Sequence, residues 1–357
     1  MPHPTLEAVR AAAREGSKSF VARPLVLLTG VLGLAGATAS LLAWTRRRIL
    51  TVRVLKAFFS RNGRMRNRAQ LSRVPGDVGC QLDLPYGSHP DARLDCFFPA
   101  SIEGTADCLG TVIWIHGGAW IAGDKAQLSS YFRILAGQGF TVIGVNYPLA
   151  PAARYPSPVE HLHEALTWVV AHAESLHVDA DRLVLAGDSA GAQLAAQLTA
   201  MITCPDYATA VAIPPTIRPD QLRGVVLFCG IYDVSLLEFK GRRSWFLRTI
   251  VWAYSGADRV EGNPAADLIC VPRWVTAAFP RPFVSVGNGD LLLDHSLALV
   301  DALGACGVEA DTLFFADDHR PKLGHEYQFD SSLEAFDQAF DRLVAYLNRC
   351  VAEVQRV

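Results

Sequence analysis

The chain of 357 residues is half hydrophobic, so it can bury a full core, and one large domain with additions is expected. Its net charge of −2 gives no reason to expect a nucleic-acid partner. Positive charge is nevertheless concentrated between Thr45 and Gly76, where there are ten Lys or Arg residues and no acidic residue. This asymmetry requires a local explanation.

An uncharged stretch precedes the basic residues. After an N-terminal tail over residues 1–24, residues 25–44 carry no charge and have the length that an α-helix needs to span a membrane. Trp44 and Arg46–Arg48 then provide the aromatic and cationic groups typical of a membrane interface. We therefore expect a transmembrane helix over residues 25–44. A signal peptide cleaved near residues 37–39 and a buried core helix are the alternatives.

The basic segment, residues 45–80, is then expected to adjoin the membrane. Its excess of positive charge over the N-terminal tail favours the cytosolic side for the rest of the chain. The sequence thus predicts a single-pass membrane protein, for example of the endoplasmic reticulum. Residues 49–59 mix apolar and basic side chains, a pattern that suits a helix on the membrane surface or a helix that covers the following domain.

The first motif follows a short apolar run. Thr111–Ile115 is rich in β-branched residues and is expected to form a buried parallel strand. It is followed by His116-Gly117-Gly118-Ala119-Trp120, a glycine-rich loop. Backbone N–H groups of such a loop can stabilise an oxyanion, so Gly117, Gly118 and Ala119 are candidate donors.

The second motif lies at a strand-to-helix turn. A helix over 125–137, a strand over 141–145 and a helix over 159–173 are expected before it. The apolar run 182–186 then ends in Gly187-Asp188-Ser189-Ala190-Gly191, which fits G-x-S-x-G and precedes a helix over 190–198.

In the G-x-S-x-G pattern a serine nucleophile sits on a strained turn between a strand and a helix. The turn is tight, and a Cβ atom two residues to either side would clash. We expect Ser189 to be the nucleophile and the N–H of Ala190 to be a further oxyanion donor. With the glycine loop, this motif predicts a serine hydrolase.

Further strands are expected over 224–228, 282–286 and 311–315. Strands that alternate with helical patterns predict a mostly parallel α/β sheet with helices on both faces. Residues 236–279 break the alternation and are rich in Trp and Pro, so we expect a helical cap over the carboxyl ends of the strands. The domain is expected to cover residues 81–350.

A serine nucleophile needs a base and an acid that orients the base. In enzymes that carry this turn, the acid and then the histidine base follow the serine in the chain. Asp290 comes after the strand over 282–286, on a loop where catalytic groups concentrate; Asp294 is its rival. His325 comes after the last predicted strand and before a helix over 332–347. His319, in a polar run, is the competing histidine.

Neither a metal nor a cofactor is expected. The chain contains no H-E-x-x-H pattern and no paired Cys/His spacing of the kind that binds zinc.

These motifs together resemble the hormone-sensitive-lipase family of α/β hydrolases, which includes arylacetamide-deacetylase-like and sterol-acetate-hydrolase-like esterases. The resemblance covers roughly residues 82–347. It implies an α/β-hydrolase fold with a helical cap and hydrolysis of a lipophilic, uncharged ester or acetate through an acyl-enzyme. Two positions depart from the family pattern: Ala119 replaces a third glycine, and Glu326 replaces the usual residue after the histidine. The motifs are His116–Trp120, Asn146–Pro151, Gly187–Gly191, Gly289–Asp294 and Gly324-His325.

Other functions share this set of residues. Amide or formamide cleavage and acyl transfer proceed through the same acyl-enzyme. A non-catalytic ligand receptor on the same fold is a third class, but such a receptor is expected to have lost a member of the triad, and none is missing here.

Overall fold

The structure is a computed structural model that describes residues 29–352, apart from 238, 240, 242–243 and 258–261. In these residues an eight-stranded sheet has the order β1-β2-β4-β3-β5-β6-β7-β8. β1 pairs antiparallel with β2, and β2 pairs antiparallel with β4. The remaining neighbours, in the order β4-β3-β5-β6-β7-β8, pair in parallel. The strands are β1 (Val78–Pro85), β2 (Arg93–Pro99), β3 (Leu109–Ile115), β4 (Thr141–Val145), β5 (Val178–Asp188), β6 (Leu222–Phe228), β7 (Pro282–Val286) and β8 (Asp311–Phe314).

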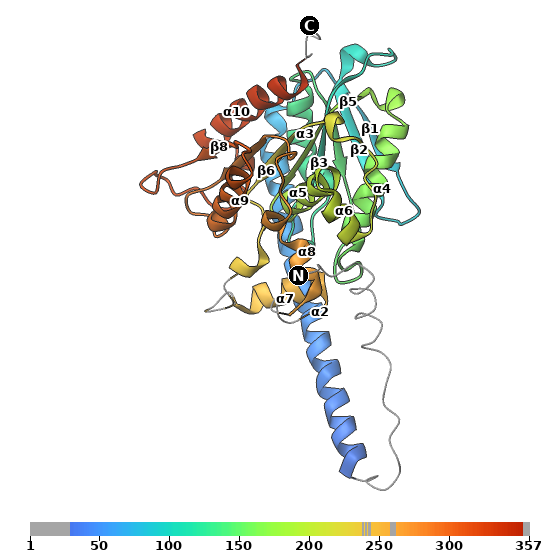
Figure 1. Cartoon of the computed structure of the whole chain (residues 1–357), viewed down its shortest axis with the longest axis vertical. Helices are drawn as coiled ribbons and strands as arrows, with labels where there is room; N and C mark the ends of the chain where they lie inside the picture. Colours follow the sequence, from blue (N-terminus) through green and yellow to red (C-terminus); the bar gives the residue numbers. More distant parts are fainter. Residues whose placement is uncertain (1–28, 238, 240, 242–243, 258–261, 353–357) are drawn as a thin grey trace.

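Helices cover both faces of the sheet, as predicted (Figure 1). Successive strand residues point to opposite faces. Val112 and Trp114 of β3 therefore pack in one apolar cluster with α3 and α10, whereas Ile113 and Ile115 pack in another with α4, α5 and α9. The helices are α2 (Thr29–Ala69), α3 (Ser129–Ala136), α4 (Ser157–Ala171), α5 (Ala190–Thr203), α6 (Pro205–Val211), α7 (Ser244–Ser255), α8 (Pro264–Ile269), α9 (Leu293–Ala305) and α10 (Glu334–Val351).

The predicted elements agree with this arrangement in most places. β4 and β7 have the predicted bounds, while β3, β5 and β6 begin earlier than expected. β1 and β2 were not predicted. β1 is only half-buried, so it lacks the continuous apolar run that marks a central parallel strand. The domain boundary predicted at residue 81 falls inside β1.

The transmembrane helix predicted for residues 25–44 is wrong. Residues 25–28 lie outside the described part of the chain, and within that part no helix combines the length and the hydropathy needed to cross a membrane. The uncharged start of α2 contains glycines and threonines and passes into Arg46–Arg48 within the same helix. The prediction of a single-pass membrane protein, with its orientation, is corrected accordingly.

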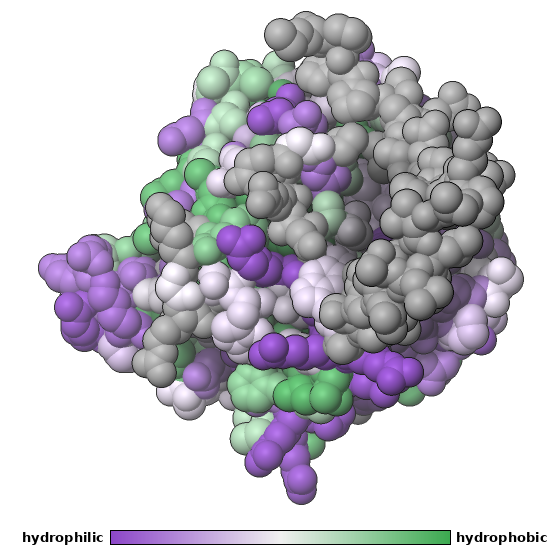
Figure 2. All heavy atoms as spheres, turned by 90° about the horizontal axis from the view of Figure 1, so that it is seen from below, coloured by the Kyte–Doolittle hydropathy of each residue, from purple (hydrophilic) through white to green (hydrophobic). Residues whose placement is uncertain are grey.

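α2 instead extends away from the sheet at its N-terminal end and runs along the domain at its C-terminal end (Figure 1). Figure 2 views the molecule from the side on which α2 projects and shows hydrophilic and hydrophobic residues next to one another there.

The region predicted as a cap contains α7 and α8, and α7 packs against α2. The ring centroids of Trp44 and Trp252 lie 6.1 Å apart, and those of Phe59 and Phe246 lie 6.3 Å apart. α2 therefore belongs to the helical layer above the carboxyl ends of the strands.

Candidate functional site

The turn at Ser189 joins β5 to α5. Ser189 has φ 52°, a left-handed value that is costly for a residue with a Cβ atom. A Cβ atom on Gly187 would lie 2.5 Å from the backbone of Gly191, and one on Gly191 would lie 2.0 Å from the carbonyl oxygen of Ile115. Both glycines are therefore required for the turn, which presents Ser189 at the carboxyl end of β5.

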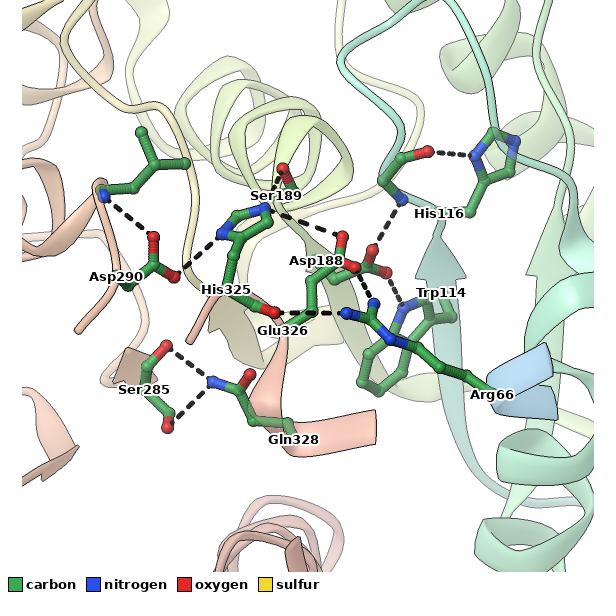
Figure 3. A network of polar contacts seen from close by, with 12 residues as sticks. Arg66, Trp114, His116, Asp188, Ser189, Ser285, Asp290, His325, Glu326 and Gln328 are labelled. Atoms are coloured by element: carbon green, nitrogen blue, oxygen red, sulfur yellow. Dashed lines mark hydrogen bonds and ion pairs between the residues drawn. The ribbon is translucent and has the colours of Figure 1, made fainter. Parts of the chain in front are cut away.

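Ser189 belongs to a chain of hydrogen bonds. Its Oγ lies 2.9 Å from Nε2 of His325, and Nδ1 of His325 lies 2.9 Å from Oδ2 of Asp290 (Figure 3). Oδ1 of Asp290 accepts a hydrogen bond of 2.9 Å from the N–H of Leu292, and the Asp290 side chain is fully buried. This contact holds the carboxylate toward the imidazole.

The charges around His325 favour its protonated form. Loss of solvent lowers the pKa of His325, but Cys229, Asp290 and Glu326 oppose this effect, and the pKa is raised well above its usual value. Burial raises the pKa of the Cys229 thiol to about 11, so this thiol is neutral near pH 7. With the thiol neutral, Asp290 and Glu326 still raise the pKa of His325 against the effect of burial.

Neither rival residue takes part in this chain of hydrogen bonds. Asp294 is exposed in the first turn of α9, while Asp290 occupies the position beside His325. The ring of His319 packs against Phe315 with centroids 4.8 Å apart. The structure thus brings together Ser189, Asp290 and His325 and leaves out both rivals.

Cys229, which follows β6, completes a group of residue types found in metal sites. Its Sγ, one Asp290 oxygen and one His325 nitrogen lie within 4.8 Å of one another. Both nitrogens of His325 are already engaged by Ser189 and Asp290. We therefore assign these groups to the hydrogen-bonded chain and not to a metal.

The glycine loop lies beside the serine, but Gly117 differs from expectation. Its N–H donates a hydrogen bond of 2.8 Å to Oδ2 of Asp188, and Oδ1 of Asp188 accepts one of 2.9 Å from Trp114 Nε1. This corrects the assignment of Gly117 as an oxyanion donor, because its N–H is already engaged. Gly118, Ala119 and Ala190 remain candidate oxyanion donors.

Asp188 therefore positions the glycine loop, which agrees with its interpretation from the sequence as a structural carboxylate. Its side chain is buried between Trp114 and Gly117. Burial, and after it the charge of Glu326, raises the pKa of Asp188 to about 7. Gly118 has φ 113° and a Cβ atom there would lie 2.3 Å from the carbonyl oxygen of Ala122, so the loop needs glycine at this position.

A cavity of about 1070 Å³ opens in front of Ser189. Its lining includes the polar side chains of Ser189, His325, Glu326 and Arg66. Apolar side chains of α2, of α7 and of the loops that follow β6 and β7 also line it. These side chains are Phe58, Phe59, Ile231, Leu236, Leu237, Phe246, Leu247, Ile250, Val251, Leu291 and Leu292.

Two residues of the cavity, Arg66 and Glu326, were not predicted as site residues. Arg66, near the end of α2, forms an ion pair with Glu326. Arg66 belongs to the basic segment over residues 45–80, and Glu326 is one of the two departures from the family pattern. The contact itself joins residues 260 positions apart, so no local pattern could predict it.

His295 on α9 also lines the cavity and gives a prediction for acid stability. It is buried, it accepts a hydrogen bond of 3.4 Å from the N–H of Asp233, and burial lowers its pKa to about 4. As pH falls from about 6.5 to 4, the unfolded chain binds a proton that the folded His295 does not. At pH 5 this reduces the free energy of unfolding by about 2 kcal/mol.

In the variant His295→Gln, the difference in unfolding free energy between pH 7 and pH 5 should therefore shrink by about 2 kcal/mol, measured by urea denaturation. His172→Gln, at an exposed position, is the control. An unchanged pH dependence in His295→Gln would contradict the prediction.

The sequence and the fold agree with those of known proteins. Residues 112–319 match the model of a family described as alpha/beta hydrolase fold. The chain belongs to this family. Among its relatives, the acetyl esterase of Salmonella choleraesuis (strain SC-B67) is 34% identical over 233 residues, which are 63% of this chain and 67% of that protein. The acetyl esterase of Salmonella agona (strain SL483) is 29% identical over the same shares.

Solved α/β hydrolases have the same fold. The crystal structure of inhibited esterase B from Lactobacillus rhamnosis matches with a TM-score of 0.71 at 24% identity, covering 85% of this chain and 97% of that one. EstE1, a thermostable carboxylesterase from a metagenomic library, matches with a TM-score of 0.64 at 21% identity, covering 84% and 98%. With the family match and the relatives, the expected membership of the hormone-sensitive-lipase group of α/β hydrolases is confirmed.

Proposed function

We propose that this chain, a carboxylesterase-type hydrolase, cleaves lipophilic, uncharged esters through an acyl-enzyme on Ser189. The observation that carries the proposal is the unbroken chain of two 2.9 Å contacts from Ser189 through His325 to Asp290. A serine hydroxyl is a weak nucleophile unless a base accepts its proton, and this arrangement supplies that base and its orienting acid.

The first half of the reaction forms the acyl-enzyme. Oγ of Ser189 attacks the ester carbonyl carbon while Nε2 of His325 takes the hydroxyl proton. The carbonyl oxygen becomes an oxyanion, which accepts hydrogen bonds from the N–H groups of Gly118, Ala119 and Ala190. The C–O bond to the alcohol then breaks, and His325 gives its proton to the departing alcohol.

The second half releases the acid. Water attacks the acyl carbon, His325 takes a proton from the water, and the bond to Ser189 breaks as the proton returns to Oγ. Asp290 remains ionised throughout, keeps the Nδ1–H tautomer of His325 in place and stabilises the imidazolium that forms.

The shape of the cavity supports a lipophilic substrate. Its volume of about 1070 Å³ exceeds what an acetyl group fills, and its wall includes apolar side chains of α2 and α7. Apolar walls stabilise a hydrocarbon chain by roughly 25 cal/mol per Å² of area removed from water. The relatives are acetyl esterases, so an acetyl ester of a lipophilic alcohol also fits the proposal.

The substrate class is tested with p-nitrophenyl acetate, butyrate and octanoate, which share one alcohol and differ only in the acyl chain. Phe246 of α7 lines the cavity and is half-buried, so Phe246→Asp places a charge in its apolar wall. We expect kcat/KM for the octanoate to fall about tenfold or more, because the lost apolar contact is worth over 1 kcal/mol. The acetate should change by less than about threefold, since its chain is too short to reach the same apolar area.

The neighbouring Trp245 provides the matched control. Its side chain does not line the cavity, and Trp245 is 54% exposed, so Trp245→Asp adds the same charge without entering the site. Equal losses in the two variants, or a loss in Phe246→Asp that is the same for all three esters, would contradict the placement of the hydrocarbon chain against α7.

A further inference from the structure

α2 reaches the catalytic loop through one side chain. The Arg66 guanidinium forms an ion pair with Oε2 of Glu326, and its Nη2 donates a hydrogen bond of 3.4 Å to the carbonyl oxygen of His325 (Figure 3). The Arg66 side chain is 37% exposed and that of Glu326 is 19% exposed. Arg66 therefore contacts both the histidine backbone and the residue that follows it.

Glu326 places a carboxylate inside the site. The residue has φ 60°, a left-handed conformation that directs its side chain back past His325. Its Oε1 lies 3.8 Å from Nε2 of His325, and a Cβ atom on Gly117 would lie 3.1 Å from the same oxygen. The carboxylate thus lies between the catalytic imidazole and the glycine loop.

An unpaired carboxylate in this position would oppose catalysis in two ways. It would favour the protonated form of His325, which cannot accept the proton of Ser189. It would also repel the negative charge that develops on the carbonyl oxygen near the glycine loop. A cation paired with Glu326 reduces both effects.

Several titratable or charged groups face His325, and together they determine the local negative charge that Arg66 offsets. Ser189 and Asp188 come from the turn between β5 and α5, Cys229 follows β6, and Asp290 follows β7. Glu326 adds a further carboxylate from the histidine's own loop. Among these neighbours, acidic side chains dominate.

We propose that Arg66 is a positioning residue for the hydrolase: paired with Glu326, it offsets the carboxylate beside His325 and ties α2 to the catalytic loop. The inference rests on the proposed function. It makes the long N-terminal helix a direct support of the histidine as well as a wall of the cavity.

Asn67 of α2 and Gln70, which directly follows α2, make other contacts that keep the helix docked when Arg66 is changed. The buried Gln70 donates a hydrogen bond of 2.8 Å from Nε2 to the carbonyl oxygen of Phe329, on the same loop. Oδ1 of Asn67 accepts one of 2.7 Å from the N–H of Ser130. A variant at Arg66 therefore removes a charge without removing the helix from the domain.

The test is the pH dependence of kcat/KM between pH 5 and 10 for a p-nitrophenyl ester. Removing Arg66 leaves Glu326 unpaired, so Arg66→Ala should move the midpoint of the acid limb upward by about one pH unit. On the acid limb this lowers kcat/KM about tenfold, and the loss disappears at high pH. Glu326→Gln should move the midpoint downward, and Arg66→Ala/Glu326→Gln should return it close to that of the unchanged protein.

Three further variants separate charge from docking. Arg66→Lys keeps the charge and should keep the midpoint. Gln70→Ala loosens the same loop without changing charge and should lower thermal stability but not move the midpoint. Arg68→Ala removes an exposed cation two residues further along α2 and should change neither.

The titration of the His325 ring, followed by NMR with His325→Gln for assignment, gives the same comparison without turnover. It should move upward in Arg66→Ala. If the midpoint is unchanged in Arg66→Ala, the proposed role of Arg66 is wrong. The role is also wrong if adding Glu326→Gln to Arg66→Ala does not return the midpoint to that of the unchanged protein. Failure of the unchanged protein to hydrolyse any ester would overturn the proposed function instead, while the NMR midpoints would still decide whether Arg66 acts on His325.

Discussion

The variant Ser189→Ala should lose ester hydrolysis by about a factor of 10⁶ in kcat and should no longer react with a fluorophosphonate probe. The reason is chemical: Oγ of Ser189 is the atom that the proposed mechanism bonds to the acyl group, and its 2.9 Å contact with His325 places a base beside it. Alanine also fits the buried site, because it only removes an oxygen. The unfolding midpoint should therefore change little.

Ser130→Ala is the matched control, because Ser130 is also buried but lies on α3 and does not line the cavity. It should keep both hydrolysis and labelling. Labelling that persists in Ser189→Ala would show that another serine is the nucleophile and would overturn the proposed mechanism.

The second large effect is expected at the acid. Asp290→Asn should lower kcat about 10⁴-fold. An asparagine that keeps the hydrogen bond from Leu292 presents its NH₂ group to Nδ1 of His325. Nδ1 must then be the acceptor, so the ring proton moves to Nε2 and points at Ser189, where a base is needed.

Asp294→Asn, one helical turn later at an exposed position, should change kcat less than about threefold. Steady-state rates of the two variants on one p-nitrophenyl ester decide between the carboxylates. A larger loss in Asp294→Asn than in Asp290→Asn would reverse the assignment of the acid.

Much of this site could be predicted because its signals are local. Ser189 needs a left-handed backbone conformation and glycines on both sides, and these requirements are written into five consecutive residues. Asp290 and His325 follow strands that were recognisable from apolar runs. Parallel strands bring their carboxyl ends to one edge, which is why residues far apart in the chain meet there.

The wrong predictions share a cause as well. Residues 25–44 were judged by length and lack of charge, but the helix that the structure describes continues through Arg46–Arg48 and packs on α7. Gly117 was grouped with its neighbours because all three residues belong to one loop. Which of their N–H groups stays open depends on Asp188, which the fold places beside Gly117 only.

The sequence by itself determined the strand-to-helix turn at Ser189, the order of the three candidate catalytic residues and the parallel sheet, because each depends on backbone conformation or on apolar periodicity within a short stretch. Only the tertiary structure decided that Arg66 pairs with Glu326, 260 positions away, and that α2 and α7 form the apolar wall of the cavity. Such contacts depend on how distant helices pack over the sheet. Packing depends on the shape and volume of all the side chains together, which no local pattern encodes.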